Sequence, residues 1–176
     1  MAAPFIWQGR TDGDTEEHLR IHQVMNKNTP AQFALIGFAS DEGVRRNKGR
    51  LGAKAGPDAI RQQLAGLPIH HPLSIRDAGT VRCDDGDLEA AQRRLSDELV
   101  DILSSNQTPI VLGGGHEVAF ASFQGLFDFI AQTQPTKTIG IINFDAHFDL
   151  RTAPEATSGT PFFTIGTLMP AASSPI

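Results

Sequence analysis

Four side chains that suit a metal ion follow two of the most apolar stretches of this sequence. His116 comes after three glycines in the stretch LGGGHE, and Asp145, His147 and Asp149 alternate in the stretch FDAHFD. Residues two apart in an extended backbone point to the same side, so the last three side chains face one region. Two converging carboxylates repel each other unless one is protonated or a cation lies between them. Imidazole and carboxylate ligands without thiolate suit Mn²⁺ and also Zn²⁺ or Fe²⁺, so the sequence predicts a divalent metal site.

The elements that must bring these residues together are parallel strands. Apolar runs predict strands at 33–39, 108–114 and 137–144, with a weaker one at 74–79. Apolar residues at helical spacing and suitable end signals predict helices at 56–67, 88–105 and 117–132. This alternation predicts an α/β fold, a three-layer sandwich with a parallel sheet. Ligands bind outside the carboxyl ends of such strands, which is where His116 and Asp145 fall.

The remaining segments carry weaker signals. Residues 16–26 are expected to form a short helix, and the polar, Gly-rich residues 41–56 a long loop. The tail after Arg151 has turn residues and little periodicity, so no closing helix or strand is expected there.

Length and composition bound the class of protein. A chain of 176 residues suits one domain or part of a larger one. The net charge of −5 argues against a nucleic-acid partner, with residues 45–50 as the one local basic cluster. Cys83 is the only cysteine, which favours a reducing compartment. No stretch has the length of a signal-peptide core or a membrane span, so we expect a cytoplasmic protein without a membrane partner.

Each polar cluster also has a simpler interpretation. An Asp-x-His sequence after a strand is commonly a hydrogen-bonded pair, and a glycine run is commonly a tight turn. The glycine run lacks the Lys-Ser/Thr of a phosphate-binding loop. His18 and His22 have helical spacing without the acidic partner of a zinc protease, which favours an exposed helix face. Both metal clusters together, each after a buried strand, favour the metal site.

The two clusters resemble a known family. The stretch GGGHE (113–117) together with NFDAHFDLR (143–151) is similar to the ureohydrolases, which include arginases, agmatinases and formimidoylglutamases. Residues 43–61 are similar to the same family's N-terminal signature. Glu117, the wording DAHFDLR and the stretch TSGTPF (157–162) are closest to formimidoylglutamase. The resemblance implies hydrolysis of N-formimidoyl-L-glutamate to L-glutamate and formamide, a small-molecule reaction of histidine degradation.

The resemblance also implies roles for single residues. Such enzymes hold two Mn²⁺ ions with a bridging hydroxide. By the resemblance His116 and Asp149 bind one ion, His147 binds the other and Asp145 bridges them. Asp149 is also the catalytic residue expected to accept the hydroxide's proton. Arg151 and Ser158 stand where the family contacts the amino-acid end of its substrate, although Arg151 also fits a solvated loop.

The sequence departs from the family in one respect. Relatives supply two further metal ligands from an S-F-D-x-D strand in their C-terminal half, and this chain has no such stretch. We therefore expect residues 1–176 to be the N-terminal portion of a single arginase-like α/β domain. Relatives fill the middle of the sheet with later strands, so we expect a gap between the strands before His116 and Asp145 and exposed apolar surface there.

Several alternatives stay open at this stage. One is an agmatinase or another guanidino hydrolase, although Arg151 would repel a cationic substrate. A second is an inactive truncated fragment that lacks the C-terminal ligands, and a third is a single-metal deacetylase of related fold. A homo-oligomer is also open, since the resembling family often forms trimers or hexamers.

Overall fold

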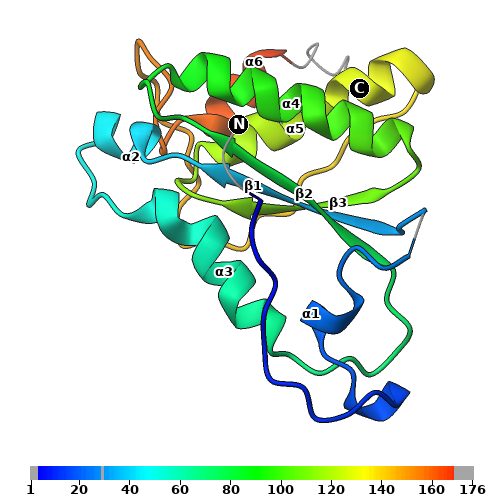
Figure 1. Ribbon diagram of the computed structural model, residues 1–176. Helices are drawn as coiled ribbons and strands as arrows, with labels where there is room; N and C mark the ends of the chain where they lie inside the picture. The colour runs from blue at the N-terminus through cyan, green and yellow to red at the C-terminus, as the bar shows by residue number, and fades with distance from the viewer. Residues whose placement is uncertain (1–3, 29, 169–176) are drawn as a thin grey trace.

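A parallel sheet of three strands forms the centre of the molecule (Figure 1). The structure, a computed structural model, describes residues 4–28 and 30–168. The strands are β1 (Phe33–Ala39), β2 (Ile75–Arg82) and β3 (Thr108–Gly113), in the order β2-β1-β3. Strand β1 pairs with both neighbours in parallel, and its residues are almost all buried. This arrangement confirms the predicted α/β class, and β2 is longer than expected.

Helices cover both faces of the sheet (Figure 1). On one face lie α4 (Leu88–Ser104) and α5 (Val118–Thr133), and on the other α1 (Ile21–Val24) and α3 (Gly56–Ala65). Alternate residues of β1 belong to two separate apolar clusters, with Ile36 in one and Leu35 in the other. The first cluster holds the buried face of α4, including Leu95 and Leu99, and the second holds Met25 and the side chain of Leu64. The three predicted layers are therefore present.

Four short helices lie in segments that were expected to form either a loop or one continuous helix. Helix α2 (Glu42–Arg46) and a 3-10 helix (Ala53–Ala55) lie inside the predicted loop 41–56. The predicted helix at 16–26 is divided into a 3-10 helix (Glu16–His18) and α1. Ion pairs from Arg45 and Arg46 to Glu42 stabilise α2, and such contacts leave no apolar periodicity to detect.

The tail after Arg151 contains one helix, α6 (Pro161–Leu168), so the prediction of a tail without a helix was wrong. Pro161 is suited to a first helical turn, and the hydroxyl of Thr164 donates to the Thr160 carbonyl oxygen one turn earlier. Residues 169–176 of this tail lie outside the described residues.

The prediction of a strand at 137–144 was wrong. The segment is irregular and largely exposed, with Ile142 83% and Phe144 97% exposed. A strand needs a neighbour for its backbone hydrogen bonds, and no strand pairs with this segment within the described residues. The exposed apolar surface that was expected next to His116 and Asp145 is thus present, on a segment without sheet pairing.

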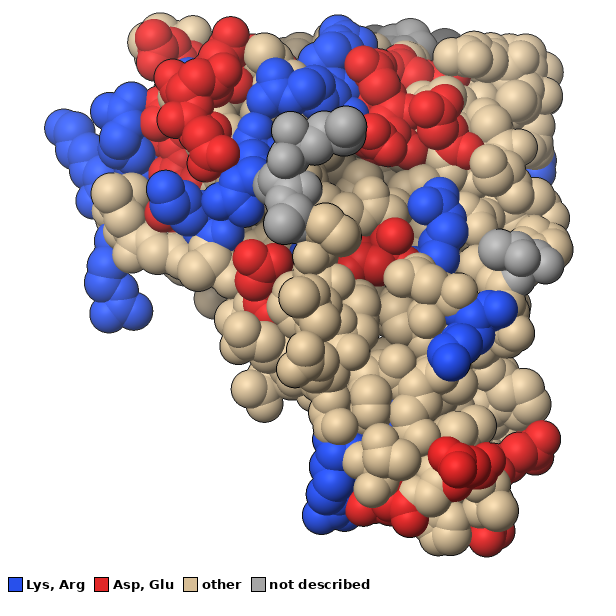
Figure 2. All heavy atoms as spheres, in the orientation of Figure 1, with Lys and Arg blue, Asp and Glu red and all other residues tan. Residues whose placement is uncertain are grey.

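The surface carries a mixed charge pattern. On the face shown in Figure 2, Lys and Arg side chains lie next to Asp and Glu side chains. Among the residues described, no helix has the length and apolar character that a membrane crossing requires.

Candidate metal centre

Three of the four predicted metal ligands lie together. The ligand atoms of His116, Asp145 and Asp149 are all within 4.8 Å of one another. His116 stands in the turn between β3 and α5, and the two aspartates stand in the irregular segment between α5 and α6. Residues that are far apart in the sequence therefore meet next to the end of β3.

His116 has a buried ring nitrogen that needs a partner. Its Nε2 atom is shielded from solvent and has no hydrogen-bond partner within the described part of the chain. The atom lies 3.2 Å from Asp149 Oδ2, without hydrogen-bond geometry. The Phe162 ring packs edge-on against the imidazole, with 5.8 Å between ring centroids. A buried, unpaired imidazole nitrogen beside a carboxylate fits a metal ligand, because burial of an unsatisfied polar atom is costly.

Asp145 is held in its charged form by its own turn. The backbone N–H of His147 donates to Asp145 Oδ1 at 2.8 Å, and this hydrogen bond is the main cause that lowers the pKa of the Asp145 carboxyl. The ring of His147 lies near the same carboxylate, with 3.4 Å between Nδ1 and Oδ1. His147 is outside the group of three, and its side chain is 80% exposed.

Asp149 has an uncommon backbone conformation. Its φ angle is +47°, in the left-handed region that most residues other than glycine avoid. Asp and Asn tolerate this region better than other side chains. Backbone conformations of this kind concentrate at functional sites, where the surrounding structure maintains them.

The turn that carries His116 is anchored by Glu117. This carboxyl is almost fully buried and accepts hydrogen bonds from Ser40 Oγ and from the Gly43 backbone N–H, each at 3.0 Å. Burial raises the pKa of the Glu117 carboxyl. A Cβ atom on Gly115 would lie 2.0 Å from Glu117 Oε2, and one on Gly114 would lie 2.5 Å from the Ser40 carbonyl oxygen. The glycines ahead of His116 therefore make room for the end of β1 and for Glu117.

The two residues predicted to contact the substrate, Arg151 and Ser158, are joined by hydrogen bonds to Asn47. Arg151 Nη1 donates to Asn47 Oδ1 at 3.2 Å, and Asn47 Nδ2 donates to Ser158 Oγ at 3.1 Å. Asn47 and residues 146–151 line a hollow of about 450 Å³. The hollow is lined by Arg151 together with His147 and Asp149, so one predicted recognition residue and two predicted metal residues share it. Sequence reasoning missed Asn47, because nothing in the polar loop distinguishes it from its neighbours.

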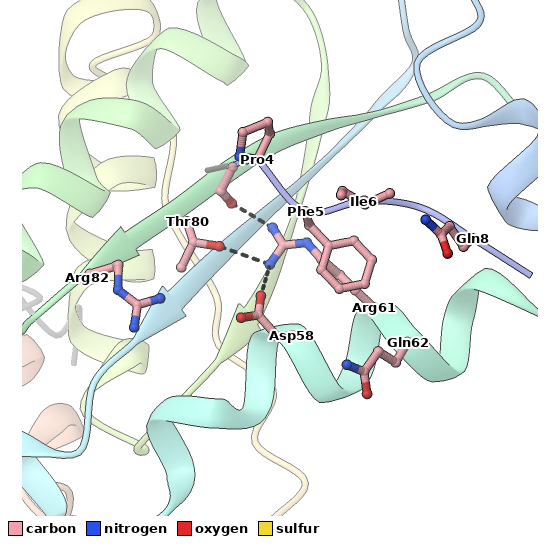
Figure 3. Close-up of a pocket in the computed structure, with 10 residues that line it drawn as sticks. Pro4, Phe5, Ile6, Gln8, Asp58, Arg61, Gln62, Thr80 and Arg82 are labelled. Carbon is pink, nitrogen blue, oxygen red and sulfur yellow. Dashed lines mark hydrogen bonds and ion pairs between the residues drawn. The ribbon is translucent and has the colours of Figure 1, made fainter. Parts of the chain in front are cut away.

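A larger hollow of about 890 Å³ lies elsewhere, between the N-terminal segment, α3 and β2 (Figure 3). Its buried cation, Arg61, is committed to the protein. It donates to both oxygens of Asp77, at 2.9 and 2.8 Å, and to Thr80 Oγ1 at 2.9 Å. The Phe5 ring lies over the guanidinium, 5.8 Å from the ring centroid. These contacts secure α3 and the N-terminal segment to β2, so we place the chemistry at the smaller hollow.

A parallel α/β fold with imidazole and carboxylates gathered at the sheet end is typical of metal-dependent hydrolases. Comparison with known proteins gives the particular family. The model of the arginase family matches residues 31–173, and the chain belongs to this family.

Two similar curated proteins carry the same name. The chain is 51% identical over 164 residues to the formimidoylglutamase of Chromobacterium violaceum. The matched stretch covers 91% of this chain and 52% of that protein. The chain is 49% identical over 166 residues to the formimidoylglutamase of Rhodococcus jostii, with 92% and 52% covered. The chain thus spans about half the length of these curated relatives.

Solved structures agree on the fold. The formiminoglutamase of Trypanosoma cruzi, solved with two Mn²⁺ ions, matches with a TM-score of 0.68 and 31% identity, over 80% of this chain and 49% of that one. The formimidoylglutamase of Bacillus subtilis matches with the same TM-score of 0.68 at 23% identity, over 84% and 48%. The expected arginase-like fold is therefore confirmed for the part that this chain spans.

Proposed function

We propose that this chain carries the metal-binding and substrate-recognition residues of a hydrolase that converts N-formimidoyl-L-glutamate to L-glutamate and formamide. The observation that carries the proposal is the convergence of His116, Asp145 and Asp149 beside a hollow that also holds Arg151. The 51% identity to a formimidoylglutamase supports the choice of substrate.

The residues present fit a divalent ion. His116 offers an unpaired buried nitrogen, and the His147 backbone N–H orients the Asp145 carboxylate, which is ionised at neutral pH. Asp149 adds a second carboxylate within reach of both. We assign His147 as the fourth ligand of a manganese site, because its ring lies beside Asp145 and its exposed side chain is free to turn. Bound Mn²⁺ would supply the Lewis acidity that activates a water molecule for attack on the formimino carbon.

The protein side chains divide the remaining work. Asp149 accepts the proton that the attacking water gives up, since its carboxylate lies within reach of the other two ligands. Arg151 faces a carboxylate of the glutamate part, for which a guanidinium provides a matching pair of donors. Ser158, which Asn47 joins to Arg151, offers a hydroxyl to the same part of the substrate. A cationic substrate such as agmatine would be repelled by Arg151.

The proposal is tested by incubating the purified chain with Mn²⁺ and N-formimidoyl-L-glutamate and measuring formamide. Mn²⁺ binding is followed separately, from the loss of the free-ion signal in electron paramagnetic resonance. We expect binding and formamide release by the unmodified chain, and loss of both in Asp145→Ala.

The matched control is Asp97→Ala, which removes an exposed carboxylate from α4, away from the cluster. Both activities should survive this change. A chain that neither binds Mn²⁺ nor releases formamide would show that the proposal is wrong, and so would equal losses in the two variants. Urea released from agmatine would favour a guanidino hydrolase instead.

A further inference from the structure

Asn47 connects two loops that come from distant parts of the chain. Its amide oxygen accepts from Arg151 Nη1, and its amide nitrogen donates to Ser158 Oγ. One side chain thus contacts both predicted recognition residues at the same time. An asparagine amide carries an acceptor oxygen and a donor nitrogen side by side. Here the oxygen contacts Arg151 and the nitrogen contacts Ser158.

The position of Asn47 is itself fixed. It directly follows helix α2, and its backbone N–H donates to the Gly43 carbonyl oxygen at 3.0 Å. That same carbonyl accepts from the Ser158 backbone N–H at 3.1 Å, and the Gly43 N–H donates to Glu117. Helix α2 is therefore attached to the turn that carries His116 on one side and to the segment that carries Ser158 on the other.

The contact with Asn47 leaves most of Arg151 available. Arg151 is exposed, and its guanidinium makes one hydrogen bond within residues 4–28 and 30–168, the bond to Asn47. Its other N–H groups remain free to meet a carboxylate in the hollow that both residues line. A long exposed side chain held in one orientation loses less conformational freedom when it binds a ligand.

We propose that Asn47 is a specificity-determining positioning residue, which orients Arg151 and Ser158 toward the carboxylate end of the substrate. The inference rests on the proposed function, because it takes Arg151 and Ser158 as substrate contacts. Asn47 acts through them and does not take part in the chemistry at the metal cluster. It should therefore affect recognition of the glutamate part and leave metal binding intact.

The test uses L-glutamate, the unreactive half of the substrate, as the probe. The metal-free, ¹⁵N-labelled chain is titrated with L-glutamate while the Arg151 Nε–Hε signal is followed by nuclear magnetic resonance. Two variants are compared. Asn47→Ala removes both hydrogen bonds, and Asn47→Asp draws the Arg151 guanidinium into an ion pair that competes with the ligand.

We expect each variant to weaken L-glutamate binding by about three- to tenfold, the loss that one or two exposed hydrogen bonds would give. Asn28→Ala, at an exposed asparagine far from the hollow, is the matched control and should bind as the unmodified chain does. Mn²⁺ binding should be equal in all four proteins. The signals of β1 residues report whether a variant is still folded.

The outcomes separate this inference from the proposed function. Glutamate binding that Asn47→Ala and Asn47→Asp leave unchanged would overturn the inference alone, and so would formamide release by a chain that does not bind L-glutamate. Equal losses of Mn²⁺ and glutamate binding in the variants would make Asn47 merely structural and would also overturn it. An unmodified chain that binds neither Mn²⁺ nor L-glutamate would overturn both proposals.

Discussion

At the scale of single residues, the candidate site brings like charges together and leaves an imidazole nitrogen unpaired. Asp145 and Asp149 both lie near His116, whose Nε2 has no hydrogen-bond partner in the described residues. Without a cation, each of these features costs free energy. Asp149 also holds a left-handed backbone, which adds to the cost. A protein retains such an arrangement where a bound ion repays it.

Asp149 gives a prediction that separates stability from metal binding. Asp149→Asn keeps the size of the side chain and tolerates the left-handed backbone, but it removes the charge that repels Asp145. We expect the thermal midpoint of the metal-free chain to stay equal or to rise slightly. Mn²⁺ affinity should fall by more than about tenfold. Loss of a residue that merely orients a metal ligand already lowers affinity by about tenfold or more, and here a charged ligand itself is lost.

Thermal unfolding by circular dichroism and Mn²⁺ titration by electron paramagnetic resonance check the two halves of this prediction. Asp149→Gly is the companion variant, because glycine relieves the backbone conformation completely. Full Mn²⁺ affinity in either variant would remove Asp149 from the ligand set.

At the scale of elements, α2 depends on charge more than on packing. Glu42 is 9% exposed and lies 2.7 Å from Arg45 Nε and 2.9 Å from Arg46 Nε. These contacts, with Arg45 as the larger cause, lower the pKa of Glu42 from 4.5 to about 2. Because the folded-state pKa is lowered, the ion pairs stabilise the folded chain above the unfolded pKa. Their contribution is lost as the pH falls through about 2.

We therefore expect Glu42→Gln to lower the free energy of unfolding at neutral pH by about 1 kcal/mol, a value kept small because Arg45 is exposed to solvent. The difference from the unmodified chain should narrow as the pH falls from about 4.5 toward 2. Urea unfolding at several pH values measures it. Glu98→Gln on an exposed face of α4 serves as the control, with little expected effect at any of these pH values. A constant difference across the range would contradict the role of the ion pairs.

The same element shows what sequence patterns can and cannot predict. Strand β1 was predictable because its continuous apolar run is buried on both faces, and helix α4 because its apolar spacing reports which face is buried. Helix α2 was not, since its five residues are too few to show apolar periodicity and its contact with Glu117 depends on the fold. Residues 137–144 have the apolar pattern of a strand, but the pattern says nothing about whether a pairing partner is present.

The candidate site divides in the same way. Residue type and spacing predicted His116, Asp145 and Asp149, which the structure brings together, although only His116 follows a strand. Asn47 was invisible in the sequence. Its role arises from a contact with Arg151, 104 residues further along the chain, and no local sequence pattern predicts such a contact.

At the scale of the whole molecule, apolar surface is concentrated on one segment beside the candidate site. Ile142, Phe144 and Phe148 are 83%, 97% and 85% exposed. Strand β3 is also an edge of the sheet, since β1 is its one neighbour within the described residues. Contiguous apolar surface and a free strand edge both favour association with another polypeptide. The chain spans about half the length of its curated relatives, in keeping with surface that the rest of the family domain would cover.

We expect the isolated chain to self-associate through this segment, and the double substitution Ile142→Thr and Phe144→Thr to reduce that association. Both side chains are too exposed to contribute to the folded core, so the thermal midpoint should change little. Sedimentation velocity at increasing protein concentration measures the effect.

The matched control replaces two exposed aliphatic residues elsewhere, Ile6→Thr and Leu67→Thr, which are 71% and 48% exposed. If the control reduces association as much, general surface hydrophobicity causes the association. If the unmodified chain stays monomeric throughout, the exposed segment does not drive assembly. A selective effect at residues 142 and 144 would instead show that the segment beside the metal ligands is a contact surface, which links completion of the fold to completion of the site.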